Sequence, residues 1–265
     1  MPRFAANLSM LFTEHPFLER FAAAKGAGFE AVEFLFPYEF DTAAIARELQ
    51  RNDLEQVLFN LPAGDFAAGD RGMANDPARI EEFRAGVAEA VRIARQLGAG
   101  HLNCLTGLRL PDVPEETQTS ALVDNLRYAA DAAGEAGIRQ VVEPLNVYDA
   151  PGYFLPTPEA GFALIERVNH PNCLLQYDVY HSQRMSGNLA ATIAARIGQI
   201  GHIQIADSPD RHEPGTGEIN FPFVLQALDE AGYDGWVSLE YRPRESTASS
   251  LRWLTEMGYW PASNA

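Results

Sequence analysis

Four short apolar runs in the second half of the chain each carry, at or near their end, one side chain whose oxygen can bind a metal ion. Stretches with a helical pattern separate these runs. The four side chains are Glu143, Asp178, Gln204 and Glu240. In a parallel (β/α)₈ barrel the carboxyl ends of all strands meet at one mouth, where active sites lie. We therefore expect these four side chains to converge on one cation.

Three carboxylates and one amide form an all-oxygen ligand set, which suits a hard divalent ion such as Mg²⁺ or Mn²⁺. Co²⁺ and Zn²⁺ are also compatible, because geometry and availability help to decide which metal a site holds. Three ionised carboxylates outweigh the charge of a divalent ion, so the site needs further donors. His181, three residues after Asp178, and Arg211 are placed to supply them, and we expect both to bind substrate.

A cation at this place could polarise a substrate carbonyl and its neighbouring hydroxyl, which makes the proton on the adjacent carbon easier to remove. Glu143 and Glu240 belong to the fifth and eighth predicted strands, well separated around a barrel. One carboxylate could then remove the proton and the other return it. This layout predicts an acid/base pair that moves a carbonyl between neighbouring carbons.

Each of these residues also has an ordinary structural interpretation. Glu143 could be solvated or cap the next helix, and Asp178 could be a helix N-cap. Gln204 could satisfy a hydrogen bond in the core, and Glu240 could pair with Arg242 or Arg244. His181 and the arginine of the second long loop could be unremarkable loop residues. The metal site is the stronger hypothesis because buried carboxylates need partners and all four positions fall on successive strands.

The whole chain alternates β-like runs with amphipathic helical stretches, which indicates a parallel sheet with helical crossovers. We expect one single-domain α/β protein, a (β/α)₈ TIM barrel spanning residues 1–265. The predicted strands are Phe4–Asn7, Ala31–Phe34, Gln56–Asn60, His101–Leu105, Gln140–Glu143, Cys173–Asp178, His202–Ile205 and Trp236–Glu240. The predicted helices lie near Pro16–Lys25, Thr42–Arg51, Arg79–Leu97, Glu116–Ala136, Pro158–Val168, Leu189–Ile197, Pro222–Ala231 and Thr247–Met257. A doubly wound open sheet is the alternative, but it often has a glycine-rich phosphate loop after its first strand, and this chain has none there.

Two predicted loops are longer than a barrel needs. One runs from Leu61 to about Pro77, and the other from Asp207 to Ile219. Long loops in compact domains are often functional, and both should lie at the carboxyl-end mouth of the barrel. A solvated surface excursion is the ordinary alternative for each.

Composition excludes several classes of protein. The formal net charge is −16, from 20 basic and 36 acidic residues, which opposes binding to a nucleic-acid backbone. No apolar run approaches the length of a membrane span, and no signal-peptide pattern opens the chain. The only two cysteines, Cys104 and Cys173, form no disulfide framework, so we expect a cytoplasmic protein. Lys25, the only lysine, sits at a predicted helix end, which disfavours Schiff-base chemistry.

Several long motifs resemble the hydroxypyruvate isomerase family, within the wider xylose-isomerase-like barrels, and the resemblance runs nearly from end to end. The motifs are Arg3-Phe4-Ala5-Ala6-Asn7-Leu8-Ser9-Met10-Leu11-Phe12, Val32-Glu33-Phe34-Leu35-Phe36-Pro37-Tyr38, Asn60-Leu61-Pro62-Ala63-Gly64-Asp65, Gln176-Tyr177-Asp178-Val179-Tyr180-His181 and His212-Glu213-Pro214-Gly215-Thr216-Gly217-Glu218-Ile219-Asn220. The opening stretch looks especially like 2-oxo-tetronate isomerases, whereas the 60–65 and 213–219 segments look more like hydroxypyruvate isomerases.

The resemblance implies a (β/α)₈ fold, a divalent metal ion held by Glu143, Asp178, Gln204 and Glu240, and Glu143 and Glu240 as the acid/base pair. It also implies a small anionic sugar acid as substrate. The expected reaction interconverts hydroxypyruvate and tartronate semialdehyde through an enediolate. The alternative is the same shift between C2 and C3 of a four-carbon 2-oxo-tetronate, and pocket shape decides between the two.

Other functions fit the sequence less well. A metal-dependent endonuclease on the same barrel would call for a basic surface and more histidines at the strand ends. A non-catalytic sugar-acid binding protein would have no need of a glutamate pair. Ketose 3-epimerases commonly have histidine where this chain has Gln204. The sequence specifies no nucleic-acid or membrane partner, and it is compatible with a homo-oligomer.

Overall fold

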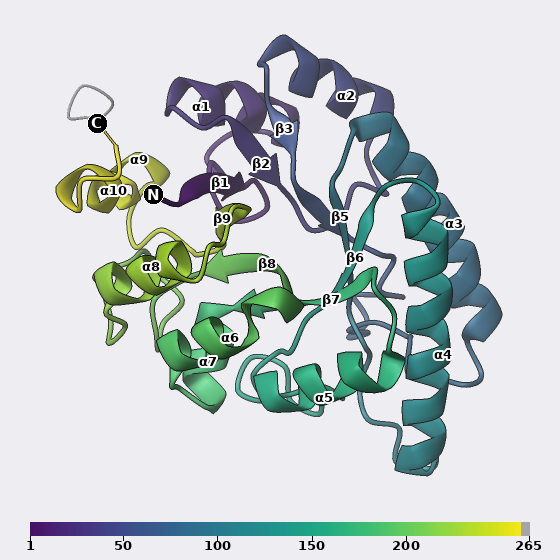
Figure 1. The fold of residues 1–265 in the computed structure, drawn as a ribbon. Coiled ribbons are helices and arrows are strands. Elements are labelled where there is room, and N and C mark those ends of the chain that lie inside the picture. Colours follow the sequence, from purple (N-terminus) through teal and green to yellow (C-terminus); the bar gives the residue numbers. More distant parts are fainter. Residues whose placement is uncertain (261–265) are drawn as a thin grey trace.

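The computed structural model describes residues 1–260 and forms one α/β TIM-barrel-like domain, with the strands in the centre and the helices around them (Figure 1). Every strand pairing in this part of the chain is parallel, in the order β3-β2-β1-β9-β8-β7-β6-β5-β4. The strands are β1 Arg3–Asn7, β2 Ala31–Glu33, β3 Glu55–Gln56, β4 Leu58–Asn60, β5 His101–Cys104, β6 Arg139–Val142, β7 Cys173–Asp178, β8 Ile200–Ile205 and β9 Trp236–Leu239. The predicted fold class is confirmed.

The sheet has nine strands within residues 1–260, one more than predicted, because the third predicted strand is divided at Val57. Its first part, β3, pairs with β2, and its second part, β4, pairs with β5. The side-chain amide of Gln56 donates to the Leu58 carbonyl at 2.8 Å across the break. The backbone N–H of Val57 still donates to the Val32 carbonyl at 2.8 Å, so the barrel is nearly closed.

The helices lie close to their predicted positions. Two of them, α2 Thr42–Arg51 and α5 Pro158–Val168, have the predicted bounds. The others are α1 Arg20–Gly26 with a preceding 3-10 turn, α3 Ile80–Leu97, α4 Glu115–Gly134, α7 Leu189–Arg196 with a following 3-10 turn, α8 Phe221–Glu230, α9 Thr247–Ser250 and α10 Arg252–Glu256. The prediction missed α6, Val179–Met185, and joined α9 to α10. Among the described helices, none has both the length and the apolar character needed to cross a bilayer.

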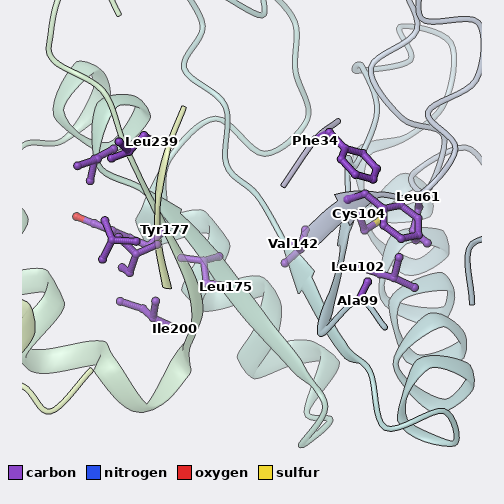
Figure 2. Packing of buried hydrophobic residues seen from close by; sticks show 14 of the residues in the cluster. Phe34, Leu61, Ala99, Leu102, Cys104, Val142, Leu175, Tyr177, Ile200 and Leu239 are labelled. Carbon is purple, nitrogen blue, oxygen red and sulfur yellow. The ribbon is translucent and has the colours of Figure 1, made fainter. Parts of the chain in front are cut away.

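Side chains alternate along each strand between the helices and the barrel interior, because successive residues of a strand point to opposite faces. Leu102 and Cys104 of β5 belong to the large cluster that packs under the helices, and Figure 2 shows them there. A second, smaller cluster, which includes Ala5 and Val141, fills the barrel interior. This alternation directs the residues two places beyond Ala5 and Val141, which are Asn7 and Glu143, to the inside.

The inward positions become polar at the carboxyl end of the barrel. The sheet register places Asn7 beside Glu33, Asn60 beside Asn103, and Asp178 beside Gln204. Glu143 and Glu240 directly follow β6 and β9. All eight side chains are buried: Asn7, Glu33, Asn60, Asn103, Glu143, Asp178, Gln204 and Glu240. Every strand position of the barrel therefore contributes one polar side chain to a layer at the mouth.

Candidate active site

A cavity of about 520 Å³ opens at this mouth. Glu143 and Glu240 line its floor together with His181. Both long loops contribute to its wall: Phe66 and Arg71 come from the first, and Pro209, Asp210 and Arg211 from the second. The two loops therefore lie where the sequence placed them, at the mouth of the barrel.

Glu143 is held by an amide from the neighbouring strand. The Asn103 Nδ2 of β5 donates to Glu143 Oε2 at 2.9 Å and to Asn60 Oδ1 at 3.0 Å. The hydroxyl of Tyr153 donates to the backbone carbonyl of Glu143 at 3.1 Å, which fixes the chain just past β6. Burial, and then the negative charges of Glu240 and Asp178, raise the pKa of Glu143 well above its ordinary value.

Asp178 is the helix N-cap that was its ordinary alternative, and its ligand role stays a prediction. Its Oδ1 caps α6 by accepting from the Tyr180 N–H at 2.8 Å. Its Oδ2 faces the site and lies 3.5 Å from both Arg211 Nη2 and His181 Nε2. Burial raises the pKa of Asp178 to about 6, although Arg211 acts in the opposite direction.

Glu240 is held by an amide and a guanidinium. Asn7 Nδ2 of β1 donates to Glu240 Oε1 at 3.1 Å, and Arg211 Nη2 donates to Glu240 Oε2. Burial raises the pKa of Glu240 to about 8, even though Arg211 lowers it. The arginine partner is Arg211 of the loop, not Arg242 or Arg244 of the adjacent segment.

Gln204 makes the core hydrogen bonds that were its ordinary alternative. Its Nε2 donates to Glu33 Oε1 at 2.7 Å, and its Oε1 accepts from Gln176 Nε2 at 2.6 Å. An amide oxygen has two lone pairs, so one acceptor position on Gln204 is still open for a metal ion. The ligand role of Gln204 stays a prediction.

His181 stands on the first turn of α6 with its ring buried. The backbone N–H of Asn146 donates to His181 Nδ1 at 3.1 Å, and Asn146 Nδ2 lies 2.7 Å from the same atom. Asn146 Oδ1 is turned away, because it accepts from the backbone of Tyr148 and Asp149. Nδ1 must therefore accept, which assigns the proton of the neutral ring to Nε2. Burial, followed by the charge of Arg211, lowers the pKa of His181 well below its ordinary value.

Arg211 is a partner of the buried carboxylates, and its side chain is only 15% exposed. Its guanidinium pairs with Glu240 and Asp178 and lies over the ring of Tyr180, 5.1 Å from the centroid. Burial alone would lower the pKa of Arg211, but the charges of Glu240, Asp178 and Glu143 raise it above its ordinary value. The alternative of a solvated loop charge is therefore wrong for Arg211.

The loop that carries Arg211 is folded around one buried carboxylate, that of Asp207. Asp207 Oδ2 accepts from the N–H groups of Gly215 and Gly217 at 2.9 and 2.8 Å. Its Oδ1 accepts from Ser208 and Ile219 at 2.9 and 3.1 Å. A Cβ on Gly217 would lie 2.0 Å from the Ser208 carbonyl oxygen, so only glycine fits there. These contacts fix the backbone that places the guanidinium at the mouth.

The site also fits a divalent cation. Glu143, Asp178 and His181 are all buried and bring ligand-type atoms within 4.8 Å of one another. Three buried carboxylates face one guanidinium here, so negative charge is left uncompensated. Within the described part of the chain, His181 Nε2 and Arg211 Nε are buried without a hydrogen-bond partner. This donor set is consistent with a metal site and with a polar ligand beside it.

The prediction did not single out four buried residues of the mouth: Asn7, Glu33, Asn60 and Asn103. The signal for them was present, because each is a polar residue near the end of an apolar run, as Glu143 and Asp178 are. His202 lies inside the barrel, where its Nε2 is 2.8 Å from Glu33 Oε2, and its strand begins two residues before the predicted start.

Comparison with known proteins defines the class first. A family model described as Xylose isomerase-like TIM barrel matches residues 21–257. Hydroxypyruvate isomerase of Escherichia coli is 48% identical over 254 residues, which cover 96% of this chain and 98% of that protein. 2-Oxo-tetronate isomerase of Cupriavidus necator is 45% identical with the same coverage. The chain belongs to the family of hydroxypyruvate isomerases and 2-oxo-tetronate isomerases, and it is an isomerase enzyme.

Solved structures agree on the fold. A crystal structure described as an AP endonuclease, family 2, from Brucella melitensis has a TM-score of 0.94 and 48% identity, and the match covers 97% of this chain and 99% of that one. A D-allulose 3-epimerase from Methylomonas sp. has a TM-score of 0.75 at 23% identity, with 99% of this chain and 93% of that one covered. The epimerase shows that the two proteins share the fold.

Proposed function

We propose that this isomerase acts on a small 2-oxo sugar acid and, in particular, interconverts hydroxypyruvate and tartronate semialdehyde. The observation that carries the proposal is the pair of buried glutamates, Glu143 and Glu240, on the floor of one cavity. The strands β7 and β8 lie between the strands that these glutamates follow. Family membership supports the reaction class, and the names of the relatives support the substrate class.

In the proposed reaction one glutamate removes the proton from C3 of hydroxypyruvate, and the electron pair of that C–H bond forms an enediolate. A proton is then delivered to C2, and the hydroxyl proton on the C3 oxygen passes to the C2 oxygen, so the ketone becomes a hydroxyl group and the hydroxymethyl group becomes an aldehyde. C3 is oxidised by two electrons and C2 is reduced by two electrons, so no external oxidant is needed. Burial raises the pKa of both carboxylates, that of Glu240 to about 8, so each binds a proton taken from a substrate carbon more readily than an ordinary carboxylate does.

His181 is proposed to bind the substrate through its Nε2–H. The hydrogen bonds at Nδ1 make Nε2 the donor, and its lowered pKa keeps the ring neutral. A neutral donor can bind a carbonyl or hydroxyl oxygen without adding charge to the site. In the same tautomer Nε2 has no lone pair for a metal ion, so the structure favours a role in substrate binding over a role as ligand.

Arginines at the mouth are proposed to bind the substrate carboxylate. Arg71, Arg211 and Arg242 all line the cavity, although the chain has a formal net charge of −16. A guanidinium offers paired donors in the planar geometry that a carboxylate accepts. These arginines stand beside the acidic residues of the cavity and give an anionic substrate local positive partners.

A divalent ion is proposed as cofactor, with Mg²⁺ or Mn²⁺ expected and Co²⁺ or Zn²⁺ compatible. Glu143, Asp178 and Glu240 would hold it, with the free lone pair of Gln204 as the fourth predicted ligand. When bound, such an ion polarises two neighbouring substrate oxygens and lowers the cost of enediolate formation. The carboxylates keep their proton-transfer role, and His181 and Arg211 orient the substrate.

The four-carbon 2-oxo-tetronate is the second candidate substrate, because a 45% identical relative carries that name. The two substrates differ by one hydroxymethylene unit, which changes the fit of the acid between the cavity floor and the arginines. The test is kcat/KM for both acids on metal-depleted and metal-reconstituted enzyme. Preference for the three-carbon acid supports the proposal, preference for the four-carbon acid selects the alternative, and no turnover of either contradicts both.

A further inference from the structure

A fully buried glutamate, Glu33, lies inside the barrel below the cavity and is not part of the proposed acid/base pair or ligand set. It ends β2 and accepts hydrogen bonds from two amides: Asn7 Nδ2 at 2.9 Å and Gln204 Nε2 at 2.7 Å. On its other oxygen, Oε2, it lies 2.8 Å from His202 Nε2. One carboxylate oxygen is therefore engaged from the adjacent strand β1 and from β8, and the other from β8, which is not adjacent to β2 in the sheet.

These contacts decide which way two amides of the active site face. Because Glu33 can only accept from an amide, the nitrogen of Gln204 must point to Glu33, and its oxygen must point away. The nitrogen of Asn7 is fixed in the same way, and the Asn7 Oδ1 accepts from the Ser9 N–H at 3.0 Å. The second hydrogen of Asn7 Nδ2 is then directed to Glu240 Oε1 at 3.1 Å.

Stability alone does not explain this arrangement. Removing a carboxylate from water is expensive, and a buried ion pair often contributes no more than apolar residues of the same volume would. An apolar side chain at position 33 would leave the amide nitrogens of Asn7 and Gln204 without this acceptor. Glu33 is within reach of both residues through direct hydrogen bonds, whereas it does not line the cavity.

We propose that Glu33 is a positioning residue, held by His202, which orients the Gln204 oxygen directly and Glu240 through Asn7. The proposal rests on the proposed function, since it assigns Glu33 to the same reaction. Loss of a hydrogen bond that orients a metal ligand or an acid/base residue typically lowers metal affinity or activity by about 10–100-fold.

The first test is Glu33→Gln, which keeps the size of the side chain but replaces one accepting oxygen by a donor. We expect kcat to fall about 10–100-fold with KM little changed, and the affinity for Mn²⁺ alone to fall about 10-fold. Binding of Mn²⁺ is measured by titration calorimetry without substrate. It therefore tests the positioning role even if neither acid turns out to be the substrate. Wild-type kcat together with wild-type Mn²⁺ affinity in this variant would overturn the proposal.

A matched control separates positioning from simple loss of stability. Asn172 lies near the opposite end of the barrel, where its Nδ2 donates to the carbonyls of Ala130 and Ile138 at 2.9 Å. Asn172→Ala should lower the melting temperature while kcat and Mn²⁺ affinity stay at wild-type values. If Asn172→Ala and Glu33→Gln lose activity in proportion to their melting temperatures, the effect is structural and the proposal is wrong.

A second variant, Asn7→Leu, tests the path to Glu240. It breaks the link between Glu33 and Glu240 and leaves the contact between Glu33 and Gln204 in place. We expect Asn7→Leu to lower kcat more than Mn²⁺ affinity, and the double variant with Glu33→Gln to lower kcat less than the product of the two single effects. Effects on kcat that simply multiply would contradict the path through Asn7.

Discussion

The two proposed acid/base glutamates are held by the same kind of contact but stand in different electrostatic surroundings. Each accepts from an asparagine on the adjacent strand, Glu143 from Asn103 and Glu240 from Asn7. The same nitrogen of Asn103 also donates to a neutral amide, the Oδ1 of Asn60. The same nitrogen of Asn7 also donates to a carboxylate, that of Glu33. Both asparagines therefore use one nitrogen to bridge two acceptors.

The difference shows how one barrel can treat two similar carboxylates unequally. The Glu143 carboxylate accepts its hydrogen bond from the neutral amide of Asn103 and is not paired with a guanidinium, although the charges of Glu240 and Asp178 also act on it. Glu240 lies between Arg211 and the Asn7–Glu33 pair, so its state depends on a balance of charges. We expect the Glu143 side to tolerate changes in charge better than the Glu240 side does.

The largest predicted effect is the loss of either glutamate. In Glu143→Gln and in Glu240→Gln a proton-transfer group is removed with little change in volume. We expect kcat to fall about 10²–10⁴-fold in each variant, with protein folding retained. The measurement is steady-state kinetics on metal-reconstituted enzyme, together with the amount of bound metal. A wild-type rate in both variants would contradict the assignment of Glu143 and Glu240 as the acid/base pair.

Removal of bound metal should impair the function of Glu143 and Glu240 together. We expect EDTA treatment to reduce activity to the level of the glutamine variants and Mg²⁺ or Mn²⁺ to restore it, because three buried carboxylates then lose their common counter-charge. The melting temperature should also rise on reconstitution, since an ion that binds only the folded protein stabilises it. Full activity after removal of all bound metal contradicts this prediction.

Arg211→Met should lower stability more than a matched change near Glu143 does. The variant leaves the Glu240 side without its guanidinium, and removing one member of a buried ion pair typically costs about 3–5 kcal/mol. We expect a loss of that order in the metal-free protein, measured by urea denaturation. The matched change on the Glu143 side, Asn103→Leu, removes one hydrogen-bond donor and should cost about 1–3 kcal/mol. Equal losses in the two variants would show that the sides do not differ in charge dependence.

The pH dependence of stability tests the charge balance around Glu240. The folded-state pKa values of Asp178, about 6, and Glu240, about 8, lie above those of an unfolded chain. The folded state therefore binds protons more tightly, and this stabilisation is lost as pH rises through the folded-state values. The metal-free protein should melt at progressively lower temperature from about pH 4 to about pH 8. Glu240→Gln should flatten the upper part of that curve, and an unchanged curve in this variant would contradict the assignment.

The sequence predicted the barrel well because its strands and helices have strong and different periodicities. The bounds of α2 and α5 matched the prediction, and both helices begin after a side chain that caps them, Asp41 and Thr157. The break at Val57 was missed because no glycine or proline interrupts residues 55–60, and the break depends on which neighbour each part pairs with. The helix α6 was missed because it follows β7 without a loop between them.

The site was predicted less completely, for a physical reason. Strand-end position identified Glu143, Asp178, Gln204 and Glu240 as candidates, and the structure brings Glu143 and Asp178 together with His181. Sequence patterns do not show which amide faces which carboxylate, so the contacts of Gln204 with Glu33 and Gln176 could not be foreseen. The pairing of Arg211 with Glu240 depends on a loop folded around Asp207, and that fold results from contacts between residues that no periodicity connects.

The most direct test of the central claim is proton exchange at the substrate carbons. Metal-reconstituted enzyme would be incubated with hydroxypyruvate in D₂O, and with 2-oxo-tetronate in parallel, and the products followed by ¹H NMR. The account predicts deuterium at C2 of the product and exchange at C3 of the substrate, both lost without metal. Deuterated product should be lost in Glu143→Gln and in Glu240→Gln, and exchange at C3 should be lost in the variant that lacks the glutamate which removes the C3 proton. Isomerised product from either acid without deuterium from solvent, or exchange that persists in both variants, would contradict the proposed roles of the two glutamates.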